Sequence, residues 1–514
     1  MSGNEDTSNE FKALGCSACA ISSRFRDQAE QRPNSTALWY RGLPVSYRAL
    51  DRASNRIAHQ LLRRSLKKGC AVGVLMNRTP NFVAAVLGIL KAGGVYLPLD
   101  AGWPLVRLQS VIEIASVSLL FVDNQDLPNI SDTVDVFLID RDQIGDVSNG
   151  NEQDMAPEIS IDASDVAYIN FTSGSSGTPK GVMVSHGGVT NLLTEQNYVS
   201  LSPKTITLQH ASPCFDAMTF ELWGALLNGG ACVLYDGALP TINRLRIAIN
   251  EYRVNTLLLT TALFNVVIDS APDMLQGLQT VLTGGESQSP HHFALAKRLL
   301  PNVNIVNVYG PTEVTVLASY FRIADFDPAW TSVPIGNAIN NCEILVLQPD
   351  LTRTPLGEVG EICVTGSGLA LGYVGRPDLT TERFTDILDV EGREIRVYRT
   401  GDIGRIDDCG LLHFLGRADH QVKLNGFRIE LEEIERALIA HPAICQAAVL
   451  IHGENLRRGL KAVLVAPSGL PDGLNMFLAR TLPSYMLPSD YVVLHDLPLN
   501  TNGKVDRAIL ADLF

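Results

Sequence analysis

Short runs of apolar residues alternate with amphipathic stretches along most of the chain. The continuous apolar runs predict buried strands at residues 72–76, 166–171, 256–259, 280–282 and 303–308. Apolar residues three and four positions apart predict helices at residues 50–62 and 80–91. This alternation of strands and helices predicts an α/β architecture with largely parallel sheets.

The pattern changes in the last third of the chain. From about Gly360, shorter strands with glycine-rich turns predict a small barrel. A last unit of about 100 residues then begins after Gly416. It contains a predicted helix at residues 430–441, with Leu431, Ile434 and Leu438 on one face. Strands follow at residues 447–451 and 461–465.

We therefore expect a large N-terminal part, residues 1–416, built from α/β subdomains plus the small barrel. A small, mobile C-terminal α+β domain would occupy residues 417–514. Residues 124–157 are rich in Asp, Asn and Ser, which predicts an irregular, exposed stretch rather than a domain boundary.

Composition narrows the class of protein. The 514 residues include 41 Lys and Arg against 55 Asp and Glu, a formal net charge of −14. Such a surface repels phosphate backbones, so binding to nucleic acids or anionic membranes is disfavoured. No segment reaches the roughly 18 apolar residues that span a bilayer, and residues 1–10 do not look like a signal peptide. The odd count of nine cysteines fits reduced thiols, so we expect a cytoplasmic protein.

The strongest local motif is Phe171-Thr-Ser-Gly-Ser-Ser-Gly-Thr-Pro-Lys-Gly181, directly after a predicted strand. Its glycines permit tight turns and close approach, and its hydroxyls and N–H groups can surround phosphate oxygens. Lys180 adds a positive charge. The segment is not a Walker A loop, because it lacks the GxxxxGK[ST] pattern. An arbitrary Ser/Gly loop would be merely flexible, but the Thr-Pro-Lys-Gly ending favours a phosphate-binding loop.

Further clusters supply the remaining groups that a nucleotide site needs. Tyr309 offers an aromatic face, Thr312 a hydroxyl and Glu313 a hard oxygen ligand for Mg²⁺. Asp402 follows a tight turn and suits paired hydroxyls, as on a ribose. Lys504, carried on a mobile unit, could stabilise charge on a reacting phosphate. Taken alone, each cluster could equally be an ordinary turn or a solvated lysine.

In combination and order, these motifs resemble the adenylation domains of nonribosomal peptide synthetases. These domains belong to the adenylate-forming superfamily, which also contains acyl-CoA ligases and luciferases. The resemblance extends from about Pro44 to Arg507. The matching motifs are residues 44–50, 90–100, 171–181, 215–223, 309–313, 360–373, 398–402, 416–430, 482–488 and 502–507.

The resemblance implies an AMP-forming ligase that works in two steps. ATP would activate an amino acid as an aminoacyl-adenylate, with release of pyrophosphate. The acyl group would then pass to the phosphopantetheine thiol of a carrier-protein (thiolation) domain. The implied cofactors are ATP and Mg²⁺, with phosphopantetheine on the partner. The implied partners are the amino acid, the carrier domain and a condensation domain of a larger synthetase, but no nucleic acid and no membrane.

The resemblance also assigns roles to individual residues. The phosphate loop would consist of Thr172, Ser173, Gly174, Ser175, Ser176, Gly177, Thr178 and Lys180. Thr312 would contact the α-phosphate, Glu313 would bind Mg²⁺ and Tyr309 would lie by the adenine. Asp402 would accept the ribose hydroxyls, with Arg417 nearby. Lys504 would bridge the substrate carboxylate and the α-phosphate, and Asp419 would be the hinge between the two domains.

Asp216 indicates the class of substrate, because in the family its position holds the α-ammonium of an amino acid. The other implied pocket residues are Ala217, Phe220, Leu258, Leu282, Gly284, Val308, Val316, Leu317 and Lys504. Leu259 replaces Leu258 if the alignment shifts by one residue. This uncharged wall would reject a charged side chain. We therefore expect valine, isoleucine or leucine, or a large charge-masked amino acid, because Gly284 and Ala217 leave volume. His210 either lines this pocket or packs beside it.

Two alternatives stay open from the sequence. An acyl-CoA ligase of the same superfamily is disfavoured by Asp216, for which it would have no use. An inactive nucleotide-binding scaffold is disfavoured because Glu313, Asp402 and Lys504 are all in place. No carrier-protein motif follows Arg507, so we expect either a domain excised from a larger synthetase or a stand-alone protein. The amino acid itself, the peptide product and the oligomeric state are left open.

Overall fold

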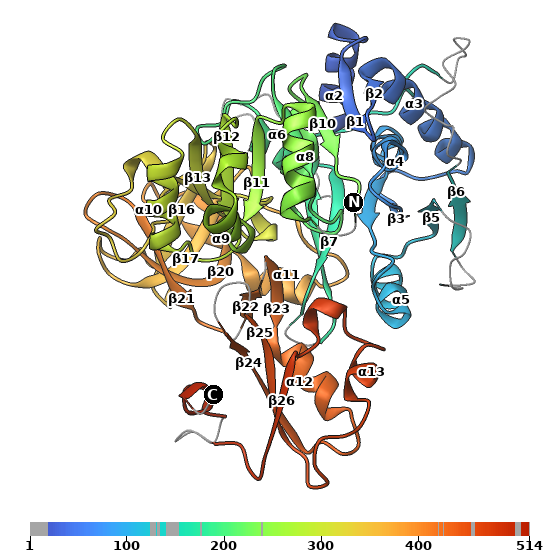
Figure 1. Ribbon diagram of the computed structural model, residues 1–514. Coiled ribbons are helices and arrows are strands. Elements are labelled where there is room, and N and C mark those ends of the chain that lie inside the picture. Colours follow the sequence, from blue (N-terminus) through green and yellow to red (C-terminus); the bar gives the residue numbers. More distant parts are fainter. Residues whose placement is uncertain are drawn as a thin grey trace.

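The computed structural model describes residues 19–123, 130, 134–139, 154–174, 177–237, 240–419, 421–424, 426–453, 458–498 and 505–512. The predicted site residues Ser175, Ser176 and Lys504 lie outside these ranges. A large part containing the first elements of the chain lies above a smaller C-terminal lobe (Figure 1). The two are connected through the short hairpin of β22 (Gln421–Leu424) and β23 (Phe427–Glu430).

The first sheet has the strand order β15-β14-β13-β12-β11-β9-β10-β1-β2. Its strands are β1 (Thr36–Tyr40), β2 (Leu43–Ser46), β9 (Ile206–Gln209), β10 (Ala231–Leu234), β11 (Thr256–Thr260), β12 (Thr280–Gly284), β13 (Asn304–Tyr309), β14 (Ser319–Arg322) and β15 (Asn337–Ala338). From β13 to β1 the strands run parallel, while β14, β15 and β2 add antiparallel edges.

The second sheet has the order β18-β8-β7-β4-β3-β5-β6 and is parallel from β7 to β6. Its strands are β3 (Ala71–Leu75), β4 (Val95–Pro98), β5 (Leu119–Val122), β6 (Asp135–Leu138), β7 (Val166–Thr172), β8 (Lys180–Ser185) and β18 (Gly372–Tyr373). The strand β6 lies within residues 124–157, so the irregular stretch expected there includes a paired strand.

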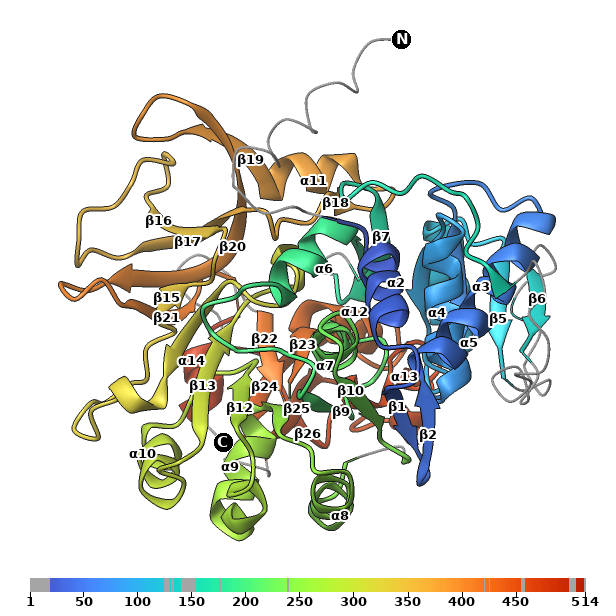
Figure 2. The ribbon, with the colours of Figure 1, turned by 90° about the horizontal axis from the view of Figure 1, so that it is seen from above.

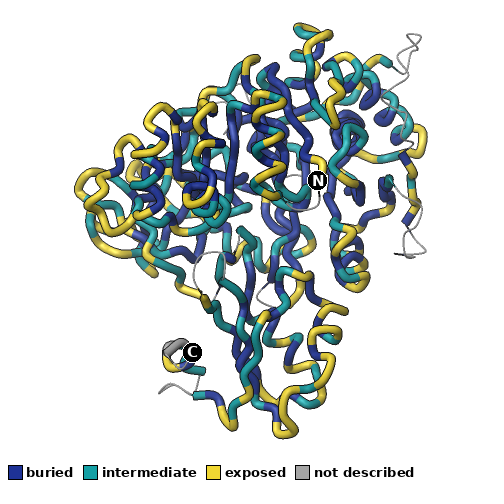
Figure 3. The backbone as a smooth tube through the Cα atoms, viewed as in Figure 1, coloured by how far each residue is buried: buried dark blue, intermediate teal, exposed yellow. Residues whose placement is uncertain are grey.

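Helices cover both faces of the first sheet. The inner layer, between the two large sheets, includes α4 (Pro80–Lys91), α6 (His186–Leu193) and α7 (Ala217–Leu226), joined by α2 (Ile21–Gln31) and α3 (Tyr47–Arg63). The outer face carries α8 (Ile242–Tyr252), α9 (Thr261–Ser270) and α10 (Pro290–Leu299), as Figure 2 shows from above. Figure 3 shows the resulting buried interior, dark blue along the central strands.

Alternation along the parallel strands assigns each side chain to one of these two layers. Leu258 and Leu282 point into the inner layer, where they join one large apolar cluster. Leu257, Leu259 and Val281 point to the outer layer and pack against its helices. This follows from the two-residue period of a strand, which places successive side chains on opposite faces. The apolar runs are continuous because both faces of these strands are buried.

A third sheet is antiparallel and has the order β16-β17-β20-β19, with β21 paired to β20. Its strands are β16 (Cys342–Leu347), β17 (Gly360–Gly366), β19 (Phe384–Leu388), β20 (Glu394–Ile406) and β21 (Leu412–Arg417), with α11 (Pro377–Arg383) beside them. This unit corresponds to the predicted barrel, but it starts at Cys342 rather than near Gly360. The short, partly exposed run of β16 explains why the pattern missed it.

The C-terminal lobe has its own sheet, β24-β25-β26, formed by β24 (Gln446–His452), β25 (Gly459–Val465) and β26 (Asp490–Leu494). Its helices are α12 (Leu431–Ile439), α13 (Leu474–Leu478) and α14 (Arg507–Asp512). The predicted stripe on α12 is buried in a separate apolar cluster of this lobe. Helix α5 (Leu105–Ile114) belongs to the large part and lies close to this lobe in Figure 1.

The strands and helices predicted from the apolar pattern are present, with ends that differ by up to three residues. The largest difference is at α3, which begins at Tyr47 because the Ser46 hydroxyl accepts a hydrogen bond from the Ala49 N–H at 3.2 Å. In α4, Pro80 stands at the first turn and Thr79 caps the helix, as the sequence pattern indicates. Among the described helices, none combines the length and apolar character needed to cross a membrane.

Candidate functional site

Several of the predicted site residues lie where parallel strands of the two large sheets end, and Asp402 and Arg417 lie on β20 and β21 of the third sheet. Strand β13 ends at Tyr309, and a short 3₁₀ helix then carries Thr312 and Glu313. Asp216 lies directly before α7, in the segment that follows β9, and therefore at the same edge. Carboxyl ends of parallel strands meet at one edge of a sheet, which is the usual place for a ligand site in such folds.

Thr312 and Asp216 are in direct contact. The Thr312 hydroxyl donates a hydrogen bond to Oδ2 of Asp216 at 2.6 Å, and both residues keep partial contact with solvent. The protein around the carboxylate raises the pKa of Asp216 by desolvation, while the Thr312 hydroxyl and the Lys423 ammonium oppose this shift. The structure thus brings together two residues that the sequence separates by almost a hundred positions. A positively charged ligand group would compensate the desolvated carboxylate.

Tyr309, Asp402 and Arg417 form a second group. The Tyr309 hydroxyl donates to Oδ2 of Asp402 at 2.5 Å, and Arg417 forms an ion pair with the other carboxylate oxygen. Asp402 and Arg417 face each other in the register of β20 and β21, which fixes this pair. Arg417 also donates from Nε to Oδ1 of Asp419 at 2.6 Å. The predicted ribose-binding residue therefore lies beside the residue predicted to contact adenine.

The phosphate loop joins β7 to β8, and Thr172 and Lys180 pair in the register of these strands. A Cβ on Gly174 would lie 1.9 Å from the Thr178 carbonyl oxygen, so no side chain fits there. Gly177 has a φ of +79°, a conformation that favours glycine. The Thr172 hydroxyl oxygen is buried and has no hydrogen-bond partner among the described residues. The loop therefore retains polar groups suited to an anion.

The donors of this loop meet residues of the C-terminal part. The Lys180 ammonium lies 3.3 Å from Oε1 of Glu430, and the Gly174 N–H donates to Oε2 of Glu433 at 3.3 Å. The Ser173 hydroxyl donates to the carbonyl oxygen of Arg428 at 2.8 Å. Burial lowers the pKa of Lys180, and the nearby Arg428 charge lowers it further.

Glu313 is fully buried, and both of its carboxylate oxygens have partners. Arg428 Nη1 donates to Oε2 at 2.7 Å, and the Tyr373 hydroxyl donates to Oε1 at 2.8 Å. Burial alone would raise the pKa of Glu313, but the Arg428 and Lys180 charges lower it to about 2. A single carboxylate next to a phosphate loop fits Mg²⁺, which is typically held by one or two carboxylates together with phosphate oxygens. The described residues contain no cluster of three or more metal-binding side chains.

The charged residues of the C-terminal part at this site were not among the predicted site residues. Arg428, Glu430 and Glu433 contact the phosphate loop or Glu313, as described above. The Lys423 ammonium lies 5.8 Å from the centre of the Tyr309 ring. Burial lowers the pKa of Lys423, whereas the nearby Asp402 carboxylate raises it. A signal was present in the sequence, because these charges cluster in and just after the motif at residues 416–430.

The predicted substrate pocket is assembled around the inner face of the first sheet. Its apolar members share one buried cluster, against which Ala217 packs, and they are Phe220, Leu258, Leu282, Val308, Val316 and Leu317. Leu259 lies on the opposite face, which favours Leu258 over its neighbour. The expected extra volume at Gly284 is not found. A Cβ there would lie 2.2 Å from the Val308 carbonyl oxygen, so neighbouring backbone fills the position.

His210 is buried behind this wall. Its Nε2 lies 2.8 Å from the Leu258 carbonyl oxygen and 3.3 Å from Oε1 of Glu221. Burial lowers the pKa of His210 to about 4 and raises the pKa of Glu221 to about 8. Oε2 of Glu221 also accepts hydrogen bonds from the N–H groups of His210 and Ala211. These contacts describe a side chain that packs beside the wall and supports the end of β9.

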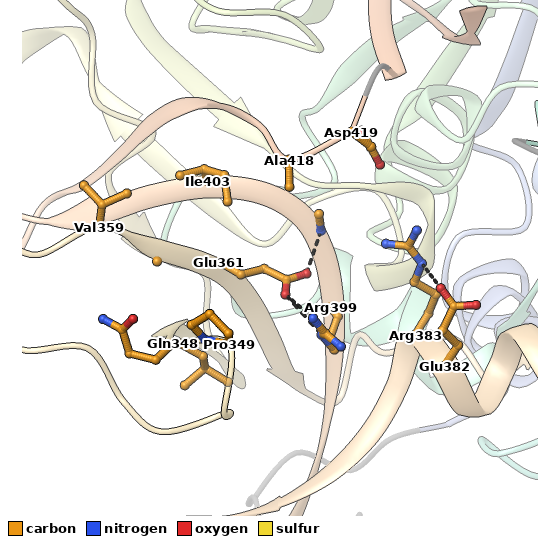
Figure 4. Close-up of a pocket in the computed structure, with 13 residues that line it drawn as sticks. Gln348, Pro349, Val359, Glu361, Glu382, Arg383, Arg399, Ile403, Ala418 and Asp419 are labelled. Carbon is orange, nitrogen blue, oxygen red and sulfur yellow. Dashed lines mark hydrogen bonds and ion pairs between the residues drawn. The ribbon is translucent and has the colours of Figure 1, made fainter. Parts of the chain in front are cut away.

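A pocket of about 550 Å³ lies beside Asp419, between the third sheet and residues 418–419 (Figure 4). Glu361 occupies its middle, where it accepts hydrogen bonds from Arg399 Nη2 at 2.7 Å and from the Gly401 N–H at 3.0 Å. Arg383 borders it from α11. The lining contains none of the phosphate-loop residues, but it includes Asp419, which accepts a hydrogen bond from Arg417.

Comparison with known proteins identifies the family. A family model described as "AMP-binding enzyme" matches residues 25–374, and one described as "AMP-binding enzyme C-terminal domain" matches residues 433–504. The chain belongs to the AMP-binding enzyme family. It is 36% identical over 491 residues to bacitracin synthase 1 of Bacillus licheniformis and 35% identical over 495 residues to surfactin synthase subunit 3 of Bacillus subtilis (strain 168). These matches cover 95% of the chain but only 9% and 38% of the two relatives.

Solved structures agree with this assignment. A holo NRPS protein containing adenylation and PCP domains, bound to a vinylsulfonamide inhibitor, has a TM-score of 0.86 at 32% identity, covering 96% of this chain and 84% of that one. An artificially fused adenylation-PCP di-domain NRPS from Klebsiella oxytoca has a TM-score of 0.84 at 27% identity, covering 93% of this chain and 94% of that one. The predicted fold class is confirmed, with a large N-terminal and a small C-terminal domain.

The family and its relatives also identify the type of enzyme. They confirm the sequence-based identification of an adenylation domain of the nonribosomal peptide synthetase type, an AMP-forming ligase. Adenylate-forming enzymes use ATP, which agrees with the phosphate loop and with the group around Asp402. Among the solved structures, the o-succinylbenzoate CoA synthetase of Bacillus subtilis, 22% identical with a TM-score of 0.83, shares the fold.

Proposed function

We propose that this chain activates an amino acid with ATP and transfers the resulting aminoacyl group to the phosphopantetheine thiol of a carrier-protein domain. The observation that carries the proposal is the contact between Asp216 and Thr312 at the edge of the nucleotide site. The desolvated carboxylate attracts the α-ammonium of an amino acid, and the neighbouring hydroxyl belongs to the nucleotide site. The substrate carboxylate would thereby lie beside the α-phosphate that it attacks, which provides proximity and orientation.

In this proposal, each nucleotide group has a designated partner. Ser173, Gly174 and Lys180 bind the β- and γ-phosphates, with Thr172 supplying a further hydroxyl. Asp402 accepts the ribose hydroxyls, and Tyr309 lies by the adenine ring. Glu313 holds Mg²⁺, which when bound neutralises phosphate charge. Thr312 contacts the α-phosphate, and Lys504 stabilises the developing charge from the C-terminal domain.

The division of labour between two domains is part of the proposal. Residues 1–416 provide the ATP and amino-acid sites, and residues 417–514 form a lid that turns at Asp419. The lid presents Lys504 for adenylation and opens access for the carrier thiol in the second step. Carrier and condensation domains of a larger synthetase are the proposed partners, consistent with relatives that combine adenylation and PCP domains. We place the reaction in the cytoplasm, where ATP and carrier domains are available.

The proposed substrate has an uncharged side chain. The inner wall formed by Phe220, Leu258 and Leu282 belongs to an apolar cluster and offers no partner to a charge. Val308 fills the space that Gly284 leaves, which favours valine, isoleucine or leucine over larger amino acids. The alternative substrate is a large amino acid whose side-chain charge is masked.

Amino-acid-dependent exchange of labelled pyrophosphate into ATP tests this function. We expect exchange with branched aliphatic amino acids, no exchange with lysine or glutamate, and no requirement for CoA. An acyl-CoA ligase would instead respond to carboxylic acids without an amino group. Absence of exchange across all amino acids and their charge-masked derivatives would overturn the proposal and favour an inactive scaffold.

A further inference from the structure

Charged residues of the large part are paired with the C-terminal part across the nucleotide site. Lys180 pairs with Glu430, Glu313 pairs with Arg428, and these contacts measure 3.3 and 2.7 Å. A third pair, between Arg107 of α5 and Glu433 of α12, measures 2.8 Å. No side chain in these pairs is more than 15% exposed. Both domains therefore have their charges neutralised in the lid position that the structure describes.

In the first two pairs, the partners on the large part, Lys180 and Glu313, are groups that the proposed function assigns to the nucleotide and its metal. Lys180 and the Gly174 N–H would otherwise face phosphate oxygens, and here they face carboxylate oxygens of Glu430 and Glu433. Glu313 would otherwise face a cation, and here it faces the Arg428 guanidinium. Carboxylates and phosphates are both anionic acceptors that bind the same cationic and N–H donors. The lid thus reproduces the charge pattern of a metal-bound polyphosphate.

We propose that the end of β23 and the first turn of α12 act as a built-in substitute for pyrophosphate. This segment binds the phosphate loop after pyrophosphate has left, and it competes with pyrophosphate that returns. This inference rests on the proposed function, because it needs the loop to bind the phosphates of ATP. It adds a specific role for Glu430 and Glu433, with Arg428 as the matching cation for Glu313.

The physical reason lies in the cost of leaving a buried charge without a partner. Departure of pyrophosphate would leave Lys180 and Glu313 unpaired inside the protein, which is unfavourable. When the lid takes this position, Glu430 pairs with Lys180 and Arg428 pairs with Glu313, so both buried charges regain a partner together. Pyrophosphate and this lid position cannot use the same donors at once. The apparent affinity for pyrophosphate is therefore reduced by the fraction of molecules in which the lid occupies the loop.

This competition predicts an unusual direction of effect. Removing a charge that merely supports the structure would weaken ligand binding or leave it unchanged. Removing a lid carboxylate that competes with the ligand strengthens ligand binding, because fewer molecules have an occupied loop. Glu430→Gln is the preferred change, since the glutamine carbonyl oxygen can still accept the hydrogen bond that Gln421 donates at 2.6 Å.

The matched control is Glu432→Gln in the same turn of α12. It removes the same charge from nearly the same place, and Glu432 has no contact with the phosphate loop among the described residues. A general electrostatic effect on anion binding would change both variants alike. An effect of competition changes the Glu430 variant alone.

The experiment measures binding of inorganic pyrophosphate in a magnesium-containing buffer by isothermal titration calorimetry. We expect Glu430→Gln to bind pyrophosphate about tenfold more tightly than the wild type, because buried charge pairs couple by enough free energy for at least that factor. Glu432→Gln should stay within about twofold of the wild type. Unchanged or weaker binding by Glu430→Gln, or equal tightening by both variants, would overturn the inference.

A second variant covers the case in which Glu430→Gln does not fold. Glu433→Gln keeps one acceptor oxygen, which can serve either Arg107 or the Gly174 N–H but not both. We expect this variant to tighten pyrophosphate binding in the same direction. Wild-type pyrophosphate exchange is measured in parallel. Exchange by the wild type without tightening in either variant refutes this inference alone, whereas absence of exchange refutes the proposed function.

Discussion

Replacement of Asp216 by asparagine isolates the charge that the proposed function requires. The carboxylate accepts a hydrogen bond from Thr312 at 2.6 Å, and an asparagine carbonyl oxygen can accept the same bond. The side chain keeps its size and stays at the start of α7. The change therefore removes the attraction for an α-ammonium group and leaves the local structure in place.

The magnitude follows from the surroundings of this carboxylate. Desolvation by the surrounding protein raises the pKa of Asp216, so a charge partner here is worth more than one on the surface. Loss of one member of a desolvated, hydrogen-bonded charge pair costs about 3 kcal/mol. Because each 1.4 kcal/mol corresponds to a factor of ten, kcat/KM for the amino acid should fall about 100-fold. Most of the loss should raise KM, since the ammonium is bound both before and during the reaction.

The assay is amino-acid-dependent pyrophosphate exchange at varied amino-acid concentration, with ATP binding measured separately. Asp490→Asn is the control, because its partly exposed carboxylate lies at the start of β26 in the sheet of the C-terminal lobe and pairs with Lys461. It should behave as the wild type. The reasoning fails if Asp216→Asn stays within about threefold of wild-type kcat/KM, or if its ATP affinity falls as much as its amino-acid affinity.

Further changes test other parts of the structure. Gly426→Val places a Cβ 2.6 Å from Cγ2 of Thr260, at a residue whose φ of +83° favours glycine. The change should displace the β22–β23 hairpin and slow carrier loading at least tenfold, while pyrophosphate exchange persists. Equal loss of both activities would contradict this. Lys91→Met removes the ammonium that lies 2.6 Å from the Asp51 carboxylate and should lower the free energy of unfolding in urea by about 3 kcal/mol. A loss below about 1 kcal/mol would count against it. Burial lowers the pKa of His186 to about 4, whereas a histidine in the unfolded chain protonates near 6.5. The unfolded state therefore binds a proton first as the pH falls, and the free energy of unfolding should decrease by about 3 kcal/mol from pH 6.5 to pH 4. That slope should be smaller in His186→Asn, and an unchanged slope would refute the assignment.

Local patterns were sufficient for the elements and for the order of the motifs. Helix α4 agrees with its predicted range because Thr79 and Pro80 define its start in the sequence itself. The strands of the parallel sheets were recognisable because burial on both faces requires continuous apolar runs. The start of the third sheet was missed because β16 is only partly buried, so its residues carry no clear alternation.

The choice between Leu258 and Leu259 required the structure. The two neighbours have the same side chain, and only the pairing of β11 with β9 and β12 decides which one faces the inner layer. The same holds for Gly284, whose missing side chain suggested free volume. The approach of the Val308 backbone fills that volume, and strand packing, rather than the size of a ligand, explains this glycine.

The sequence by itself determined the family, through several motifs in a fixed order, and it predicted the phosphate loop and the candidate partners of ATP. Each motif could be recognised because its residues are close together in the chain. The tertiary structure decided which charges face one another. Glu313 and Arg428 are 115 positions apart, and Lys180 and Glu430 are 250 apart, so no local pattern can pair them. Their pairing depends on where the C-terminal lobe lies against the large part. That position is set by long-range packing and by the need of each buried charge for a partner.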